Sequence, residues 1–219
     1  KSAIALIEKQ NELQEQRLSI SRDLHDNIGA QLTFIISSVD NIKYAFEIQN
    51  EKLDSKLQNI SNFTKSTIIE LRDTIWAMNS DEITFEDLRS RILNFIEKAK
   101  TAKEDIDFQF TIDDKLNQLR LNSVFGMNIY RVIQEAVNNA LKYSNAKQIE
   151  IVVYKVENNL AVKISDNGVG FDLENTVKGN GIMNMEKRIE SIGGIINIDS
   201  KVNEGTIVSF LIPDNTVEK

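Results

Sequence analysis

Hydrophobic residues in the first third of the chain recur at alternating spacings of three and four. This spacing is typical of amphipathic helices. A short polar connection near residues 48–51 predicts an antiparallel hairpin, with a first helix over about 2–47. Two helices alone cannot bury both apolar stripes, so we predict a homodimeric four-helix bundle. The first stripe consists of Leu24, Ile28, Leu32, Ile35, Val39, Ile42 and Phe46, and the second, imperfect stripe consists of Leu53, Leu57, Ile60, Thr64, Ser66 or Thr67, Leu71, Ile75 and Met78.

The pattern changes after residue 80. Thr84 followed by Asp87 predicts a capped helix start, and Ser123 opens another helix to about Tyr143. Alternating apolar and polar residues favour a largely antiparallel sheet covered on one face by helices. We therefore expect two domains, a helical hairpin at 1–80 and an α/β sandwich at 81–219. The predicted strands are 107–112, 148–156, 160–165, 195–200 and 206–212, with a further helix at 183–192.

Composition narrows the possible functions. The 219 residues include 33 acidic and 26 basic side chains, a net charge of -7 that argues against nucleic acid as a partner. One histidine and no cysteine exclude disulfides, thiol nucleophiles and Cys/His zinc sites. No apolar run approaches the roughly 20 residues that span a bilayer. Since the chain begins at Lys1 without a signal-like stretch, we expect a piece of a longer protein.

The one histidine, His25, lies in the sequence Arg22-Asp23-Leu24-His25-Asp26. Because Leu24 belongs to the apolar stripe, His25 lies about 100° round the helix, at the flank of the bundle and accessible to water. An imidazole that is partly neutral near pH 7 can act as a nucleophile, and Asp26 is placed to accept the other ring proton. The alternative is an ordinary solvated helix surface, and a lone histidine does not decide between the two.

The second region carries further polar motifs. One predicted helix presents Glu135, Asn138, Asn139 and Lys142 within successive turns. After it, Asp166-Asn167-Gly168-Val169-Gly170 ends a strand in a glycine turn, and Gly179-Asn180-Gly181 leads into a helix whose N-terminus can receive phosphate. Each motif is weak alone, because Asp-Asn-Gly is a common turn and Gly-Asn-Gly lacks the third glycine of a dinucleotide fingerprint.

The order of these motifs is more specific than any one of them. A helix bearing Asn139, then Asp166-x-Gly168-x-Gly170, then Gly179-x-Gly181, then Gly205-Thr206 resembles the Bergerat ATP-binding fold. Sensor histidine kinases, Hsp90-type chaperones, MutL-type repair ATPases and anti-sigma kinases share that fold. With the histidine box in front of it, the chain resembles the sensor histidine kinases of the NarL/LuxR-associated subfamily, from about residue 20 to 213.

The resemblance implies an ATP-dependent protein-histidine kinase. His25 would attack the γ-phosphate of ATP, Asp26 would orient the ring and take up its proton, and Arg22 would steady the transferred phosphoryl group. The phosphoryl group would then pass to an aspartate of a response regulator with a helix-turn-helix output. The resemblance also implies a homodimer in the cytoplasm that makes no direct contact with nucleic acid. Any membrane anchor would belong to upstream segments.

The same resemblance assigns the nucleotide site. Asn139 would hold Mg²⁺ with support from Glu135, and Asn138 is a second candidate. Lys142 or Tyr143 would face the phosphates or the nucleotide, with simple packing as the alternative for Tyr143. Asp166 would accept a hydrogen bond from the adenine amino group and so discriminate against guanine. The backbone at Gly168 and Gly170 would approach the base, Gly179 and Gly181 would flank a lid over about 173–180, and Thr206 would either reach a phosphate or be structural.

One position departs from the subfamily. Its members often carry a glutamine four residues after the acid that follows the histidine, where it positions water for dephosphorylating the regulator. Here that position is Ala30, and Gln31 comes one later, which rotates the amide by about 100° on a regular helix. The sequence therefore predicts kinase activity and leaves phosphatase activity open.

Two other classes of function compete with this prediction. The chain could be a non-catalytic dimeric scaffold or nucleotide-binding module, although the joint presence of His25, Asp26, Asn139 and Asp166 argues against it. It could also be a conformational ATPase of the chaperone or repair type, in which case the hairpin bearing His25 would have no use.

Overall fold

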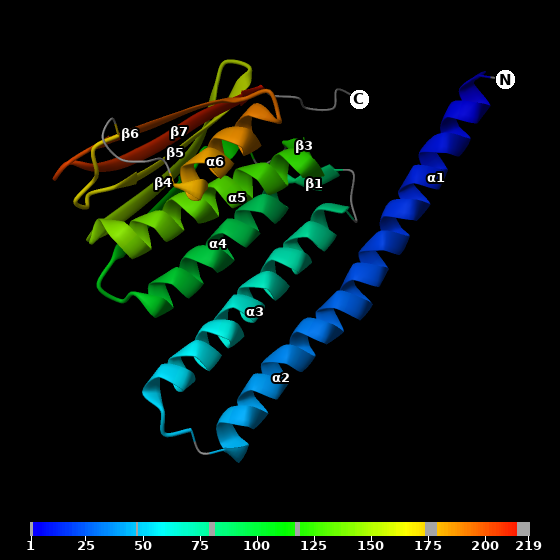
Figure 1. Ribbon diagram of the computed structural model, residues 1–219. Coiled ribbons are helices and arrows are strands. Elements are labelled where there is room, and N and C mark those ends of the chain that lie inside the picture. Colours follow the sequence, from blue (N-terminus) through cyan, green and yellow to red (C-terminus); the bar gives the residue numbers. More distant parts are fainter. Residues whose placement is uncertain (1, 47, 79–81, 117–118, 174–178, 214–219) are drawn as a thin grey trace. The chain divides into compact units, whose positions relative to one another are not determined.

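The computed structural model describes residues 2–46, 48–78, 82–116, 119–173 and 179–213. The chain divides into two compact units, Lys1–Asp81 and Glu82–Lys219. Figure 1 shows a helical first unit and a second unit in which helices pack on a sheet. The predicted combination of a helical hairpin and an α/β sandwich is confirmed.

The first unit is a long helical hairpin. It consists of α1 (Ser2–Asp23), a π-helical turn (Leu24–Ile28), α2 (Gly29–Ala45) and α3 (Glu51–Met78). Figure 1 shows α2 and α3 side by side, and Lys43 of α2 forms an ion pair of 2.8 Å with Asp54 of α3. Asn50 starts α3 because its Oδ1 accepts the N–H groups of Lys52 and Leu53 at 3.0 and 3.1 Å. The predicted first helix is confirmed over Ser2–Ala45 with a π-helical turn within it, and its predicted end at Glu47 lies outside the described residues.

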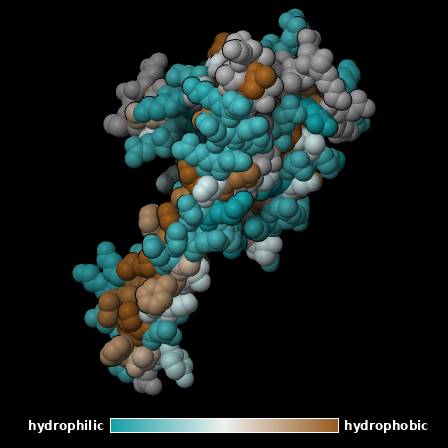
Figure 2. All heavy atoms as spheres, turned by 90° about the vertical axis from the view of Figure 1, so that its right-hand side faces the viewer, coloured by the Kyte–Doolittle hydropathy of each residue, from teal (hydrophilic) through white to brown (hydrophobic). Residues whose placement is uncertain are grey.

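The hairpin leaves much of its apolar stripe uncovered. Val39 and Leu57, on the two helices, are 5% and 9% exposed, whereas Ile28, Ile35 and Ile42 are 39%, 40% and 42% exposed in the single chain. Figure 2 shows apolar side chains gathered in the lower part of the view, where the hairpin turns. Two helices thus bury only one side of the stripe against each other, as their pattern predicted.

The second unit contains a five-stranded sheet with strand order β2-β4-β5-β7-β6. All neighbouring pairs are antiparallel except β2 and β4, which are parallel because α5 carries the chain across between them. The prediction of a largely antiparallel sheet is confirmed. The elements are β1 (Glu82–Thr84), α4 (Phe85–Ala102), β2 (Asp107–Ile112), a 3-10 turn (Asp114–Leu116), β3 (Arg120–Asn122), α5 (Ser123–Asn139), a π-helical turn (Ala140–Ser144), β4 (Gln148–Val156), β5 (Asn159–Asp166), α6 (Asn180–Glu190), β6 (Ile195–Lys201) and β7 (Gly205–Pro213).

Helices α4, α5 and α6 cover one face of this sheet (Figure 1). Alternate residues of β4, Ile149, Ile151 and Val153, are at most 1% exposed, and they share the core with Ile129 and Ile133 of α5, which are fully buried. The strand alternation read from the sequence and the apolar face of α5 therefore meet in one hydrophobic core.

A small second sheet was not predicted. Strands β1 and β3 pair antiparallel, with Ile83 opposite Leu121. Each has only three residues, too few for alternation to be recognised. The capped start that follows β1 is confirmed, because Thr84 and Asp87 exchange side-chain and backbone hydrogen bonds of 3.1 Å.

In the described ranges, no helix combines the length and the apolar character needed to cross a bilayer.

Candidate active site

His25 and Asp26 lie together on the π-helical turn between α1 and α2. The Gly29 N–H bonds to the Leu24 carbonyl, five residues back, which is the π-helical pattern. His25 Nδ1 lies 3.0 Å from Asp26 Oδ1, and the two side chains are 67% and 74% exposed. With the Nδ1 hydrogen donated to the carboxylate, the lone pair is on Nε2, at the other edge of an exposed ring. The predicted exposure of His25 is confirmed, and the contact at Nδ1 favours the tautomer whose lone pair is on Nε2.

Arg22 is exposed near the end of α1, one turn before His25. The sequence predicted this residue to steady the transferred phosphoryl group because it lies one turn before His25. That role stays a prediction.

The π-helical turn also changes the position of Gln31. A π-helical turn holds one residue more than an α-helical turn, so it offsets a one-residue shift in the residues that follow. Gln31, six residues after His25, therefore lies nearer to the direction that the fifth residue has on a regular helix. The expected rotation of about 100° assumed a regular helix, and phosphatase activity stays open.

At the end of β5, Asp166 is a partly buried carboxylate held by backbone donors. Burial raises its pKa, and hydrogen bonds from the Gly168 and Thr206 N–H groups, with the nearby Ser144 hydroxyl, oppose that rise. The bond from Gly168 reaches Asp166 Oδ1 at 2.9 Å. A fixed, partly desolvated carboxylate of this kind is suited to accept a hydrogen bond from an amino group.

The two glycines after Asp166 stand where the chain passes close to its neighbours. A Cβ at Gly168 would overlap the Ser144 carbonyl oxygen. Gly170 has φ +54, and a Cβ there would overlap the Lys201 carbonyl oxygen. The loop thus lies tightly between the end of α5 and the β6–β7 hairpin, which side chains at these positions would prevent.

Helices α5 and α6 bring together three of the predicted site residues. A Cβ on Gly181 would overlap the Glu135 carboxylate and lie 3.3 Å from Asn139 Nδ2. Glu135 and Asn139 are both half-buried. A carboxylate and an amide beside a helix N-terminus fit Mg²⁺, which takes few protein ligands and completes its octahedron with phosphates and water. Within the described ranges, no group of three or more His, Cys, Asp or Glu residues could hold a metal by itself.

The remaining predicted residues surround these two groups. Asn138 is half-buried beside Asn139, while Lys142 and Tyr143 are exposed on the π-helical turn that ends α5. Tyr143 is 72% exposed, so the packing alternative for it was wrong.

Gly179 and Thr206 lie at the ends of two elements. Gly179 is the N-cap residue of α6, with open space around its Cα. Thr206 is paired with Asp166 in the sheet. The middle of the expected lid, residues 174–178, lies outside the described residues.

Two further residues lie beside Asp166, and sequence reasoning missed one of them, Ser144. Ser144 is buried, donates to the Ala140 carbonyl at 2.7 Å, and accepts the Val169 N–H at its own carbonyl at 2.7 Å. Gly205 has φ +82, and a Cβ there would overlap the Asp166 carbonyl oxygen. The sequence signalled Gly205 through the Gly205-Thr206 pair. It gave no signal for Ser144, because the loop that Ser144 contacts lies more than twenty residues further along the chain.

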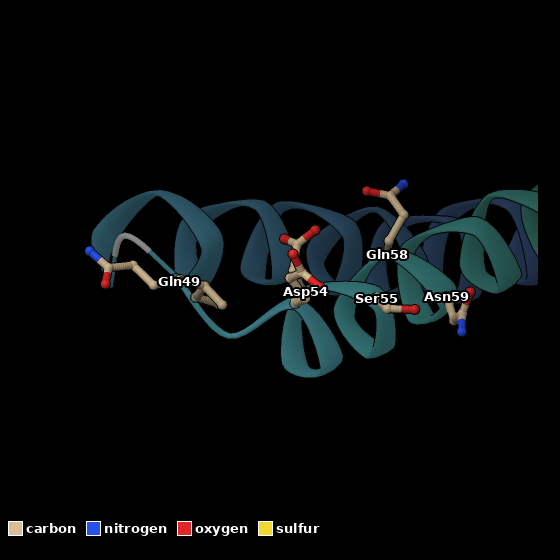
Figure 3. A pocket seen from close by; sticks show the side chains of 7 residues that line it. Gln49, Asp54, Ser55, Gln58 and Asn59 are labelled. Atoms are coloured by element: carbon tan, nitrogen blue, oxygen red, sulfur yellow. The ribbon is translucent and has the colours of Figure 1, made fainter.

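A separate hollow of about 380 Å³ lies at the turn of the helical hairpin (Figure 3). It is on the order of 30 Å along the helix from His25, so it is separate from the His25–Asp26 pair. Its lining is mostly polar and consists of Ile48, Gln49, Glu51, Asp54, Ser55, Gln58 and Asn59.

Two family profiles match the chain in succession. Residues 16–83 match the family described as "Histidine kinase" (HisKA_3), and residues 126–216 match "Histidine kinase-, DNA gyrase B-, and HSP90-like ATPase" (HATPase_c). The first match contains His25 and the hairpin, and the second contains Asn139, Asp166 and Gly181. The chain belongs to the histidine kinases, and the predicted resemblance to their NarL/LuxR-associated subfamily is confirmed.

Among curated proteins, the chain is 28% identical over 202 residues to the oxygen sensor histidine kinase NreB of Staphylococcus carnosus. The alignment covers 91% of this chain and 57% of NreB. The chain thus spans little more than half the length of this curated relative.

Solved histidine kinases share the fold. The histidine kinase domain of a blue-light activated kinase from Erythrobacter litoralis aligns with a TM-score of 0.55 and 13% identity, over 84% of this chain and 94% of that one. Histidine kinase AdeS of Acinetobacter baumannii aligns with a TM-score of 0.56 and 18% identity, over 88% of this chain and 98% of that one. At these identities the likeness concerns the fold alone.

Proposed function

We propose that this chain is the kinase portion of a two-component sensor, and that it autophosphorylates His25 with ATP. The observation that carries the proposal is the exposed His25–Asp26 pair, with its 3.0 Å contact at Nδ1, in a chain that also has an ATP-binding domain. Nε2 attacks the γ-phosphorus, the new N–P bond forms, and the bond from that phosphorus to the bridging oxygen breaks as ADP leaves. The Nδ1 proton passes to Asp26, which removes the positive charge from the ring.

In this proposal Glu135 and Asn139 hold the magnesium end of the nucleotide. Mg²⁺, when bound, neutralises charge on the β- and γ-phosphates. Asn139 is the protein ligand, Glu135 supports it or a bound water, and Asn138 is the second candidate. Their support is the close contact of both side chains with the start of α6, where backbone N–H groups favour phosphate. Arg22 steadies the phosphoryl group as it moves to His25.

Asp166 reads the adenine in this proposal. Its carboxylate accepts the amino hydrogen, whereas guanine presents a carbonyl oxygen at that position and is rejected. The tight course of the loop at Gly168 and Gly170 supports a close approach of backbone and base. Lys142 and Tyr143 are exposed, as residues that contact nucleotide must be before it binds. Thr206 lies beside Asp166 in the sheet, and Gly179 is the N-cap residue of α6.

The functional form is a homodimer in this proposal. Ile28, Ile35 and Ile42 are seven residues apart and about 40% exposed in one chain, which is the pattern of a seam between helices. Ile35→Glu is expected to convert the dimer to a monomer in sedimentation equilibrium, and a variant that stays dimeric would contradict the proposed seam.

The phosphoryl group passes from His25 to an aspartate of a response regulator, the partner that we propose from the family. We also propose that this regulator has a helix-turn-helix output and that the reaction takes place in the cytoplasm.

The test compares the chain with its His25→Gln variant, both incubated with Mg²⁺ and γ-labelled ATP. We expect acid-labile, alkali-stable label on the parent alone, since no second histidine exists to carry it. Calorimetric titration with a non-hydrolysable ATP analogue should give the same affinity for both proteins. ATP binding without label would favour the non-catalytic scaffold, and ATP hydrolysis without label would favour a conformational ATPase.

A further inference from the structure

Ser200 is a buried serine at the end of β6 that sequence reasoning did not single out. It is 8% exposed, and its hydroxyl lies within hydrogen-bond distance of three groups. These are the Phe171 N–H at 3.0 Å, the Gly205 carbonyl at 3.1 Å and the Thr206 hydroxyl at 2.9 Å. A serine has one hydrogen to donate and two lone pairs, so these three partners use its full capacity.

Counting donors fixes the direction of these bonds. The Gly205 carbonyl can only accept, so it takes the Ser200 hydrogen. The Phe171 N–H can only donate, and the Thr206 hydroxyl donates to the lone pair that remains. Ser200 therefore holds the Thr206 side chain in one orientation, with the Thr206 oxygen left as an acceptor.

These partners lie at both ends of the loop that begins with Asp166. Thr206 is paired with Asp166 in the sheet, and Phe171 ends the segment with the two tightly packed glycines. Backbone bonds hold the middle of the loop, from Val169 N–H to the Ser144 carbonyl at 2.7 Å and from Asn203 N–H to the Val169 carbonyl at 2.6 Å. The Ser200 side chain thus links the strand beside Asp166 to the far end of the same loop.

We propose that Ser200 is a positioning residue of the nucleotide site, whose hydroxyl fixes Thr206 and the end of the 166–171 loop and so sets the shape of the adenine pocket. The proposal rests on the proposed reading of adenine by Asp166. It concerns nucleotide affinity and base selectivity, because the hydrogen-bond partners of Ser200 all lie at the loop that begins with Asp166 or at the strand beside it.

The test uses Ser200→Ala, Ser200→Thr and a matched control, Ser209→Ala. Ser209 is a serine of the same sheet whose hydroxyl makes one long bond of 3.4 Å, to the Asn197 carbonyl. Mg-ATP and Mg-GTP binding are measured by calorimetry, autophosphorylation is measured at saturating ATP, and thermal unfolding reports on folding.

We expect Ser200→Ala to weaken ATP binding about tenfold, as loss of a buried hydrogen-bonding group does. GTP binding should change little, so the preference for ATP narrows by a similar factor. The autophosphorylation rate at saturating ATP should stay within about twofold, since a positioning residue of the base acts on KM more than on kcat. Ser200→Thr keeps the hydroxyl and should retain the parent's preference for ATP over GTP. Ser209→Ala should bind both nucleotides as the parent does.

Equal ATP affinity and selectivity in Ser200→Ala and Ser209→Ala would overturn the proposal. So would a parallel loss of ATP binding, GTP binding and thermal stability, which would mark Ser200 as structural only. A parent chain that binds ATP but does not prefer it to GTP would overturn the role of Asp166, and this inference with it.

Discussion

Gly181, in the first turn of α6, lies so close to Glu135 of α5 that a Cβ atom at position 181 would overlap the glutamate carboxylate. The same atom would lie 3.3 Å from Asn139 Nδ2. A helix N-terminus, a carboxylate and an amide therefore meet at one point, and the absence of a side chain on Gly181 is what lets them do so.

Gly181→Ala is expected to weaken Mg-ATP binding about tenfold or more. The added methyl group has to displace Glu135, and crowding of this kind costs about 1–3 kcal/mol. Calorimetric titration with Mg-ATP measures the effect.

Gly179→Ala is the matched control for that variant. Nothing lies within 4 Å of a Cβ at Gly179, and its backbone is extended, so alanine fits there without strain. We expect ATP affinity close to that of the parent, with a slightly lower melting temperature because alanine is a poorer N-cap residue than glycine. Equal affinities for the two variants would show that the contact at Gly181 does not shape the site.

Asp26→Asn is expected to slow autophosphorylation about a hundredfold and to leave ATP binding unchanged. Asparagine can still contact the His25 ring but cannot take up the Nδ1 proton. Single-turnover labelling with γ-labelled ATP gives the rate. Asp23→Asn removes another exposed carboxylate nearby and should label at the parent rate. If the two variants slow the reaction equally, the loss is one of surface charge and not of a proton acceptor.

Asp166→Asn is expected to abolish adenine binding and yet raise stability at pH 7. Burial raises the folded-state pKa of Asp166, so between its ordinary and its raised pKa the folded chain binds more protons than the unfolded chain. The contribution of Asp166 to the free energy of unfolding therefore falls as pH rises through that interval. Above the raised pKa, the full free-energy cost of the buried charge is present. Asparagine does not ionise and avoids this cost.

Thermal unfolding of parent and Asp166→Asn between about pH 3.5 and pH 7 checks this prediction. The advantage of the variant should be greatest near pH 7 and should disappear at the acidic end, where the parent carboxyl is also neutral. A difference independent of pH would mean that the effect arises from packing and not from ionisation.

Gln31→Ala is expected to lower dephosphorylation of the phosphorylated response regulator about tenfold or more, because the π-helical turn offsets part of the one-residue shift of its amide. Autophosphorylation should be unchanged. Release of inorganic phosphate from the regulator measures the rate, and Gln49→Ala at the distant hairpin turn serves as control. A gain of phosphatase activity in Ala30→Gln, with no loss in Gln31→Ala, would show that the helix around His25 is regular in solution.

Much of the fold was predictable because its signals are local. The stripe through Ile35 and Val39 predicted the hairpin, and the alternation through Ile149 and Ile151 predicted the strand at the centre of the core. The Thr84 capping box was legible for the same reason, since both partners lie within one turn. The three-residue strands β1 and β3 escaped because neither is long enough to show a period.

The candidate site was predictable in its residues but not in its arrangement. Motif order selected Glu135, Asn139 and Gly181, yet only helix packing shows that they touch. Ser144 and Ser200 carried no signal, since a serine beside a turn is ordinary until its partners are known. The π-helical turn at His25 was also not predicted, because the two successive spacings of four at Leu24, Ile28 and Leu32 are compatible with a regular α-helix as well.

The sequence by itself therefore determined the helical hairpin, the sandwich, the lone histidine with its neighbouring acid, and the ATP-binding motifs, since each depends on spacing within a few turns or on the order of short motifs. Only the tertiary structure decided which loops touch Asp166, which helices bring Glu135 to Gly181, and how the helix turns after His25. Those features arise from contacts between segments far apart in the chain and from the hydrogen-bonding choice of a single helical turn, and neither is encoded in local periodicity.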